Sequence, residues 1–175
     1  RNRRFLSEQW ENLIPPKHFS AARAEADDKV LRDITLSIIG YDIDRDIVSA
    51  ARQNAILAGV DHQIHFQAKP VAQLSSPKKY GFIVTNPPYG ERLEEKAAMP
   101  ALYKEIGEAF AKLDTWSYYI ITGFEEAQKY IGRMADKNRK IYNGMMRTYF
   151  YQFQGPKPPK KGESMKFSKE EQKAE

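Results

Sequence analysis

Residues 80–90 read Tyr-Gly-Phe-Ile-Val-Thr-Asn-Pro-Pro-Tyr-Gly, and the fold can be worked out from this stretch. Its apolar part, Tyr80 to Thr85, predicts a buried strand, and Asn86 to Tyr89 follow where that strand ends. Strand-like and helix-like segments alternate on both sides of it, an order that favours an α/β fold with a parallel sheet and crossover helices. In such sheets ligands bind beyond the carboxyl ends of the strands, which is where Asn-Pro-Pro-Tyr is expected.

The residues Asn86, Pro87, Pro88 and Tyr89 suit methyl transfer to a nitrogen conjugated with a π system. Such a nitrogen, on adenine N6, guanine N2, cytosine N4 or a glutamine amide, is a poor nucleophile because its lone pair is delocalised. The Asn86 side-chain oxygen and the Pro87 carbonyl can accept hydrogen bonds from the NH2 group and push it towards tetrahedral geometry. The prolines fix the backbone that aims both acceptors, and Tyr89 offers a flat face for stacking. We interpret these four as candidate catalytic residues; the structural alternative is a Pro-Pro turn with a packed tyrosine.

A second motif, Gly-Tyr-Asp-Ile-Asp at residues 40–44, closes the first predicted strand. A carboxylate at the carboxyl end of a strand can accept hydrogen bonds from both hydroxyls of a ribose, so Asp42 is a candidate cofactor ligand. Ile43 would then lie against an adenine face, and Asp44 would cap the next helix. In the alternative interpretation, Asp42 and Asp44 are both helix-capping acids.

Composition narrows the class of protein. The chain has 175 residues, enough for one domain with a real core, and 41% of them are hydrophobic. It has no cysteine, which excludes disulfides and cysteine-based metal sites or nucleophiles. We see no apolar run of membrane-spanning length and no signal peptide, so we expect a cytoplasmic protein with no membrane partner. The net charge of +5 is compatible with a polyanionic partner.

Periodicity and turn signals divide the chain further. Asn143-Gly144 lies between two strand-like runs, 139–142 and 145–153, which is the strongest short signal for an antiparallel hairpin. Trp10 is expected to pack on the core. We expect residues 1–154 to form one domain and residues 155–175 to form a tail rich in Lys, Pro and Glu. The other elements expected are a helix over 20–32 whose start is marked by Pro15-Pro16, helices at 45–58, 100–113 and 124–134, and strands at 35–41, 63–67, 80–85 and 116–122.

Residues 86–93, Asn-Pro-Pro-Tyr-Gly-Glu-Arg-Leu, together with residues 40–44 and the hairpin, resemble the THUMP-associated RNA methylases. This bacterial family is also labelled N6-adenine-specific DNA methylase and is related to the rRNA guanine-N2 methyltransferases. The resemblance implies a class I, Rossmann-like methyltransferase with a mostly parallel sheet and a C-terminal antiparallel hairpin. It implies S-adenosylmethionine as cofactor and RNA, in particular large-subunit rRNA, as substrate. Asn86 and Pro87 would hold the target amino group, Tyr89 would stack on the base, and Asp42 would bind the cofactor ribose.

The chain departs from this family pattern at its start. The family has an N-terminal THUMP region, then a central first strand and a Gly-rich turn that holds the methionine part of the cofactor, and this sequence, which begins at Arg1, shows neither. We therefore expect the central first strand, between strands 35–41 and 80–85, to be missing from this chain. The N-terminal remainder of the same protein would be its partner, and the chain alone is expected to be inactive.

Three functions remain open from the sequence. The first is methyl transfer to an exocyclic amino group of RNA, favoured by the Gly-Glu-Arg-Leu extension at residues 90–93. The second is the same chemistry on adenine N6 of DNA or on glutamine N5 of a protein, which Asn-Pro-Pro-Tyr alone does not separate from the first. The third is a non-catalytic RNA-binding module, supported by the lack of the Gly-rich turn.

Overall fold

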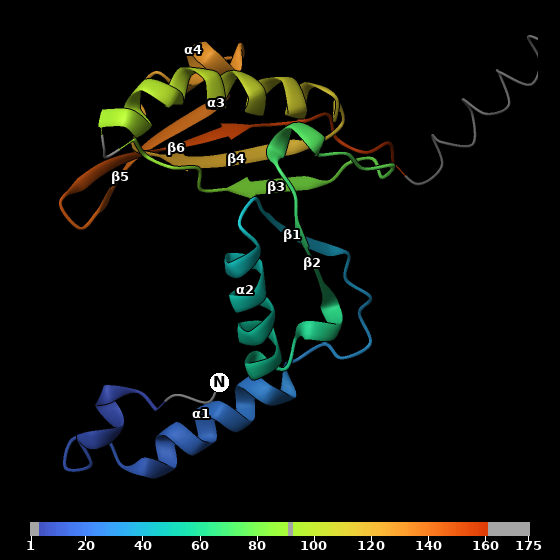
Figure 1. Ribbon diagram of the computed structural model, residues 1–175. Coiled ribbons are helices and arrows are strands. Elements are labelled where there is room, and N and C mark those ends of the chain that lie inside the picture. The colour runs from blue at the N-terminus through green and yellow to red at the C-terminus, as the bar shows by residue number, and fades with distance from the viewer. Residues whose placement is uncertain (1–3, 91–92, 161–175) are drawn as a thin grey trace, which may run out of the picture. The chain divides into compact units, whose positions relative to one another are not determined.

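The computed structural model describes residues 4–90 and 93–160, and the chain divides into two compact units, Arg1–Pro70 and Val71–Glu175. The N-terminal unit contains a two-stranded parallel sheet and the C-terminal unit a four-stranded mixed sheet (Figure 1). Strands and helices alternate through most of both units, as the sequence predicts. Within the described ranges, no helix has the length and apolar character needed to cross a bilayer.

Helix α2 connects the two parallel strands of the N-terminal unit. The Asp44 Oδ1 atom accepts hydrogen bonds from the backbone N–H groups of Asp46 (2.7 Å) and Ile47 (3.4 Å), and Gly59 ends the helix with φ at 68°. Both predicted ends of this helix are therefore confirmed. The elements are η1 Leu6–Gln9, α1 Pro16–Asp28, β1 Ile38–Asp42, α2 Arg45–Ala58, η2 Asp61–Gln63 and β2 Ile64–Ala68.

Two predictions for the first thirty residues are wrong. Trp10 was expected to pack on the core, but it is 54% exposed, and the short helix η1 beside it buries no residue. Helix α1 begins at Pro16, as Pro15-Pro16 predicted, but it ends at Asp28, four residues before the expected end at Arg32. Proline suits the first helical position because its φ is already helical and the missing N–H would have no partner there.

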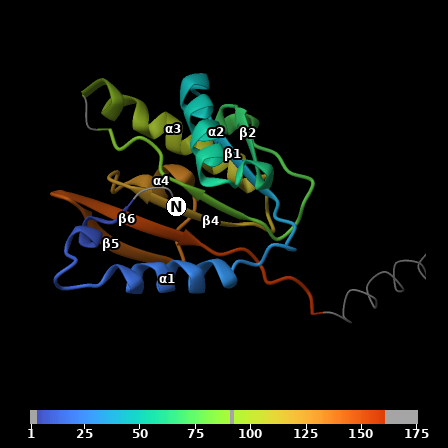
Figure 2. The same ribbon diagram turned by 90° about the horizontal axis from the view of Figure 1, so that it is seen from below.

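The C-terminal unit has the strand order β3-β4-β6-β5, in which β3 and β4 are parallel and β6 is antiparallel to both of its neighbours (Figures 1 and 2). The predicted hairpin is confirmed. Its two-residue turn is Gly144-Met145, one residue later than expected, because Gly144 takes the first central position with φ at 63°. The elements are η3 Val71–Gln73, β3 Phe82–Thr85, α3 Leu93–Ala111, β4 Ser117–Thr122, α4 Ala127–Ile131, β5 Lys137–Asn143 and β6 Met146–Phe153.

Helices α3 and α4 cover one face of the four-stranded sheet and form the core with it (Figure 1). Helix α3 begins at Leu93 and continues through Pro100, where the sequence predicted its start. Met99 and Tyr103 are 2% and 0% exposed, so the buried face extends across Pro100, and this packing outweighs the backbone hydrogen bond that proline cannot donate. The largest fully buried side chains are Tyr103, Tyr151, Phe110, Phe153, Ile120, Thr122 and Thr148.

Among the described residues, β1 pairs only with β2 and β3 only with β4, so each keeps one edge without a strand partner. Ile38 on β1 is 45% exposed and Phe82 on β3 is 70% exposed. The family pattern has a central first strand that would pair with β1 and with β3. Its absence from this chain stays a prediction.

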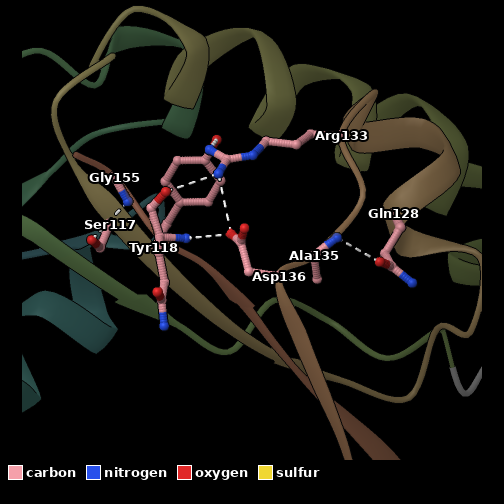
Figure 3. A network of polar contacts seen from close by, with 8 residues as sticks. Ser117, Tyr118, Gln128, Arg133, Ala135, Asp136 and Gly155 are labelled. Atoms are coloured by element: carbon pink, nitrogen blue, oxygen red, sulfur yellow. Dashed lines mark hydrogen bonds and ion pairs between the residues drawn. The ribbon is translucent and has the colours of Figure 1, made fainter.

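A polar network ties the end of β6 to the start of β4 (Figure 3). Arg133 lies over the rings of Tyr118 and Phe153 and donates hydrogen bonds to the Tyr118 hydroxyl (3.0 Å) and the Gln154 carbonyl (2.9 Å). Its ion pair with Asp136 is 3.2 Å long, and Asp136 also accepts from the Gln154 N–H at 2.7 Å. The strand end is therefore held by charge-assisted bonds as well as by the sheet.

Candidate active site

Asn86 to Tyr89 lie directly after β3, at the carboxyl end of the parallel pair. Thr85, the last residue of β3, pairs with Ile120, and β4 ends two residues later at Thr122. The residues after both strands therefore meet at one edge of the sheet, as expected for parallel neighbours. Asn86 and Pro88 are exposed, Pro87 is buried and Tyr89 is half-buried. The amide of Asn86 is thus open to a ligand while its neighbour Pro87 is fixed by packing.

A cavity of about 340 Å³ opens beside this motif. Its volume falls at the lower end of the range typical of small-molecule sites. Tyr89 contributes from the motif, and the segment after β4 contributes an aromatic ring and two carboxylates. The lining residues are Tyr89, Gly90, Lys96, Gly123, Phe124, Glu125 and Glu126.

The wall formed by Phe124 is fixed from three directions. Its ring lies 5.1 Å from the ring of Tyr103 and 5.7 Å from that of Tyr130, measured between centroids. Its backbone N–H donates to the Thr122 hydroxyl at 2.9 Å, and that hydroxyl is also hydrogen-bonded to the Tyr103 hydroxyl. A buried polar pair at the base of the segment therefore sets the position of the wall.

Gly123 lets the Tyr89 side chain approach β4. A Cβ atom at residue 123 would lie 3.3 Å from the Tyr89 Cβ and 3.6 Å from the Met146 sulfur. Tyr89 from the motif and Met146 from the hairpin thus pack over the same glycine.

Burial raises the pKa of Tyr103 to about 12, because the phenolate would lose its hydration. An unfolded tyrosine ionises near pH 10, so between pH 10 and 12 the unfolded state has released more protons than the native state. Stability should therefore fall as pH rises through this window, by about 1.4 kcal/mol at pH 11 and about 2.7 kcal/mol above pH 12 from this group. Burial also raises the pKa of Tyr151, which adds to the loss.

We expect the variant Tyr103→Phe to lack the part of the stability loss above pH 10 that comes from ionisation of Tyr103. Below pH 10 the variant should be less stable than wild type by about 1 kcal/mol, because the hydrogen bond to Thr122 is lost. The difference should shrink or reverse at pH 11. Urea unfolding at pH 8 and pH 11 measures both values, with Tyr142→Phe, at a 70% exposed tyrosine, as the matched control. A pH-independent difference between wild type and Tyr103→Phe would contradict the prediction.

The candidate cofactor residues belong to the N-terminal unit. Asp42 is the last residue of β1 and is half-buried; its Oδ1 accepts a hydrogen bond from the Asp44 N–H at 2.9 Å. From residues 4–90 and 93–160 the second oxygen receives no hydrogen bond. Ile43 is 76% exposed. Asp44 carries out the capping on its own, so Asp42 keeps an oxygen for a ligand. The structure groups Asn86 to Tyr89 in one unit and Asp42 with Ile43 in the other.

Sequence reasoning missed the segment Gly123 to Glu126. A usable signal was present, because this segment follows a predicted strand parallel to the one that carries Asn86. The side chain of Arg92 in the Gly-Glu-Arg-Leu extension lies outside the described residues.

Comparison with known proteins identifies the family. The family model for UPF0020, described as the RMKL-like methyltransferase domain, matches residues 2–152. The chain belongs to this family. That result confirms the family predicted from residues 86–93 and 40–44.

Members and solved structures of related proteins extend the comparison. The chain is 43% identical over 152 residues to the Bacillus subtilis protein named "Putative RNA methyltransferase YpsC", covering 87% of this chain and 39% of that protein. It is 39% identical over 121 residues to ribosomal RNA large subunit methyltransferase K/L of Syntrophotalea carbinolica, covering 66% and 17%. The crystal structure of SMU.472, "a putative methyltransferase complexed with SAH", matches with a TM-score of 0.81 at 38% identity, covering 90% of this chain and 42% of that one. The class I methyltransferase-like α/β fold with a mixed sheet is thereby confirmed, and the chain spans less than half of each of these relatives.

Proposed function

We propose that this chain is part of an S-adenosylmethionine-dependent methyltransferase that methylates an exocyclic amino group of RNA, namely guanine N2 of large-subunit rRNA. The single observation that carries the proposal is the position of Asn86 to Tyr89 at the carboxyl end of β3, beside a cavity lined by Tyr89 and Phe124. The UPF0020 match and two relatives named as RNA methyltransferases support the same activity.

The residues of the motif would act by holding the target amino group. The Asn86 side-chain oxygen and the Pro87 carbonyl accept its two N–H bonds, which localises the nitrogen lone pair and aims it. Tyr89 stacks on the base, and a base in folded RNA must first be flipped out of its helix to reach this position. No strong base is required, because the nitrogen becomes acidic only as it gains the methyl group. Positioning and hydrogen bonding therefore supply most of the catalysis.

S-adenosylmethionine supplies an electrophilic methyl group on a sulfonium when it is bound. Asp42 and Ile43 fit its adenosine part, because Asp42 uses one carboxylate oxygen for the Asp44 N–H and keeps the other, and Ile43 presents an exposed apolar side chain. The SMU.472 structure, complexed with SAH, supports a cofactor of this type. We propose that these residues bind the ribose and adenine, and that the methionine part is held by residues outside this chain.

The two carboxylates of the cavity favour guanine over adenine. Guanine presents an N1–H donor next to its amino group, which Glu125 or Glu126 can accept, whereas adenine N1 is an acceptor and would be repelled. Glu125 is paired with Arg147 at 3.2 Å and Glu126 with Lys129 at 3.3 Å.

The substrate class is tested by methyl transfer with the full-length protein. We expect label from S-[methyl-³H]adenosylmethionine to enter an unmodified large-subunit rRNA transcript, and nuclease digestion with mass spectrometry to give N2-methylguanosine. Double-stranded DNA and a protein extract serve as parallel substrates. Transfer to DNA or to protein in place of RNA would replace the proposal with adenine-N6 or glutamine-N5 methylation. Binding of rRNA with no transfer to any substrate would identify a non-catalytic module.

A further inference from the structure

The β5–β6 hairpin reaches beyond the sheet at the end that carries the candidate active site. Thr122, the last residue of β4, pairs with Tyr149, so residues 146–148 of β6 and their partners on β5 continue past the end of β4. Three residues of strand extend roughly 10 Å. Figure 1 shows the hairpin projecting past the ends of β3 and β4.

The base of the hairpin touches the active-site motif through a shared contact. The Met146 sulfur and the Tyr89 side chain both pack over Gly123. Arg147, the next residue, pairs with Glu125, which lines the cavity. A strand of substrate leaving the cavity along this side would therefore meet the hairpin next.

The hairpin carries positive charge and no negative charge. Residues 137–153 contain four Lys and Arg residues and no Asp or Glu. Lys140 is exposed and makes no ion pair with any residue in the described ranges. Arg147 is half-exposed and uses its Nη2 for Glu125, so other guanidinium donors remain available.

Exposed apolar side chains lie among these cations. Tyr142 is 70% exposed and Met145 is fully exposed. Tyr142 lies directly opposite Arg147, and Lys140 opposite Tyr149, so Lys140, Tyr142 and Arg147 share one face of the ribbon. A projecting aromatic ring flanked by cations matches the chemistry of single-stranded nucleic acid, whose bases stack and whose phosphates are anionic.

We propose that residues 140–147 form an RNA-binding arm. Tyr142 stacks on an unpaired nucleotide next to the target base, and Lys140 and Arg147 contact the phosphates on either side. This inference rests on the proposed function for its choice of RNA. The arm holds the substrate strand while Asn86 to Tyr89 act on the flipped base.

The test measures RNA binding and methyl transfer separately in the full-length protein. Filter binding to the unmodified large-subunit rRNA transcript is compared for wild type, Tyr142→Ala, Tyr142→Phe and Lys140→Gln. We expect Tyr142→Ala to weaken binding about 5- to 150-fold and Tyr142→Phe to bind as wild type, because the phenyl ring still stacks. Lys140→Gln should lower the slope of log K against log salt by about 0.7–0.9. In the methyl-transfer assay Tyr142→Ala and Lys140→Gln should raise KM for the RNA and leave kcat near that of wild type.

Lys112→Gln is the matched control, because Lys112 is an exposed cation just after α3, at the other end of the unit. The proposal of an RNA-binding arm would be overturned if Tyr142→Ala and Lys140→Gln kept the RNA affinity and salt slope of wild type. It would also be overturned if wild type did not bind RNA, or if the two substitutions weakened binding to duplex DNA more than binding to RNA. Normal transfer to rRNA with unaffected variants would reject the arm and leave the proposed function standing. Loss of RNA binding in the variants without transfer by wild type would support the arm and reject the proposed function.

Discussion

Asn86→Ala is expected to abolish detectable methyl transfer, with kcat at least about 10²- to 10³-fold lower than wild type, while the protein stays folded. The alanine removes the side-chain acceptor that localises the lone pair of the target nitrogen, and it leaves only the Pro87 carbonyl. The loss should appear in kcat more than in KM, because this hydrogen bond strengthens as the nitrogen becomes tetrahedral. Asn86 is exposed, so the free energy of unfolding should change by no more than about 0.5 kcal/mol.

The matched control for Asn86→Ala is Asn54→Ala, which removes an exposed amide from helix α2. Transfer to the rRNA transcript and binding of S-adenosylhomocysteine are measured for both. We expect Asn54→Ala to keep both methyl transfer and S-adenosylhomocysteine binding. We expect Asn86→Ala to lose methyl transfer and to keep S-adenosylhomocysteine binding. A kcat for Asn86→Ala within about threefold of wild type would remove Asn86 from the mechanism.

Gly107→Val should destabilise the C-terminal unit by about 3 kcal/mol, the upper end of the usual cost of overpacking. Gly107 is buried where helix α3 crosses the end of α4, and a Cβ atom there would lie 2.3 Å from the Ile131 carbonyl oxygen. That oxygen belongs to the backbone, so no side-chain rotation relieves the clash and the helices must separate. Helix α3 also supplies Tyr103, whose hydroxyl is bonded to Thr122 beneath the cavity wall, so methyl transfer should fall as well.

Ala101→Val is the matched control, because it places the same β-branched side chain at an exposed position of α3. It should cost only about 0.5 kcal/mol, the difference in helix propensity. Urea unfolding followed by far-UV circular dichroism gives both free energies. Equal midpoints for the two variants would show that α3 and α4 do not approach closely at Gly107.

Local signals predicted the elements that local physics controls. Helix α2 was predicted with both ends correct because Asp44 and Gly59 satisfy its terminal backbone groups. The hairpin was predicted from Asn143-Gly144, and Asn86 to Tyr89 were correctly expected after a strand end. The family was predicted because residues 86–93 and 40–44 combine a specific motif with its structural context.

Features that depend on distant packing were not predictable. Helix α3 continues through Pro100 because Met99 and Tyr103 are both buried against the sheet. The free energy gained by this burial comes from tertiary packing and is not visible in local helix propensity. The cavity wall at Phe124 depends on ring contacts with Tyr103 and Tyr130, which come from two different helices. Trp10 was expected to pack on the core, but it is 54% exposed, and the short helix η1 beside it buries no residue either.

The Arg133 network has a practical consequence for biochemical work. Gly155 follows β6 and donates its N–H to the Ser117 hydroxyl at 2.9 Å, at the start of β4 and so at the end of the sheet opposite Asn86. Arg133 and Asp136 fix the backbone of Gln154 just before it. A fluorophore or affinity tag attached after Gly155 would therefore follow a backbone segment that is held in place by hydrogen bonds. This segment lies far from the residues proposed to bind the base. Surface immobilisation through residues after Gly155 should therefore leave the proposed base-binding residues accessible.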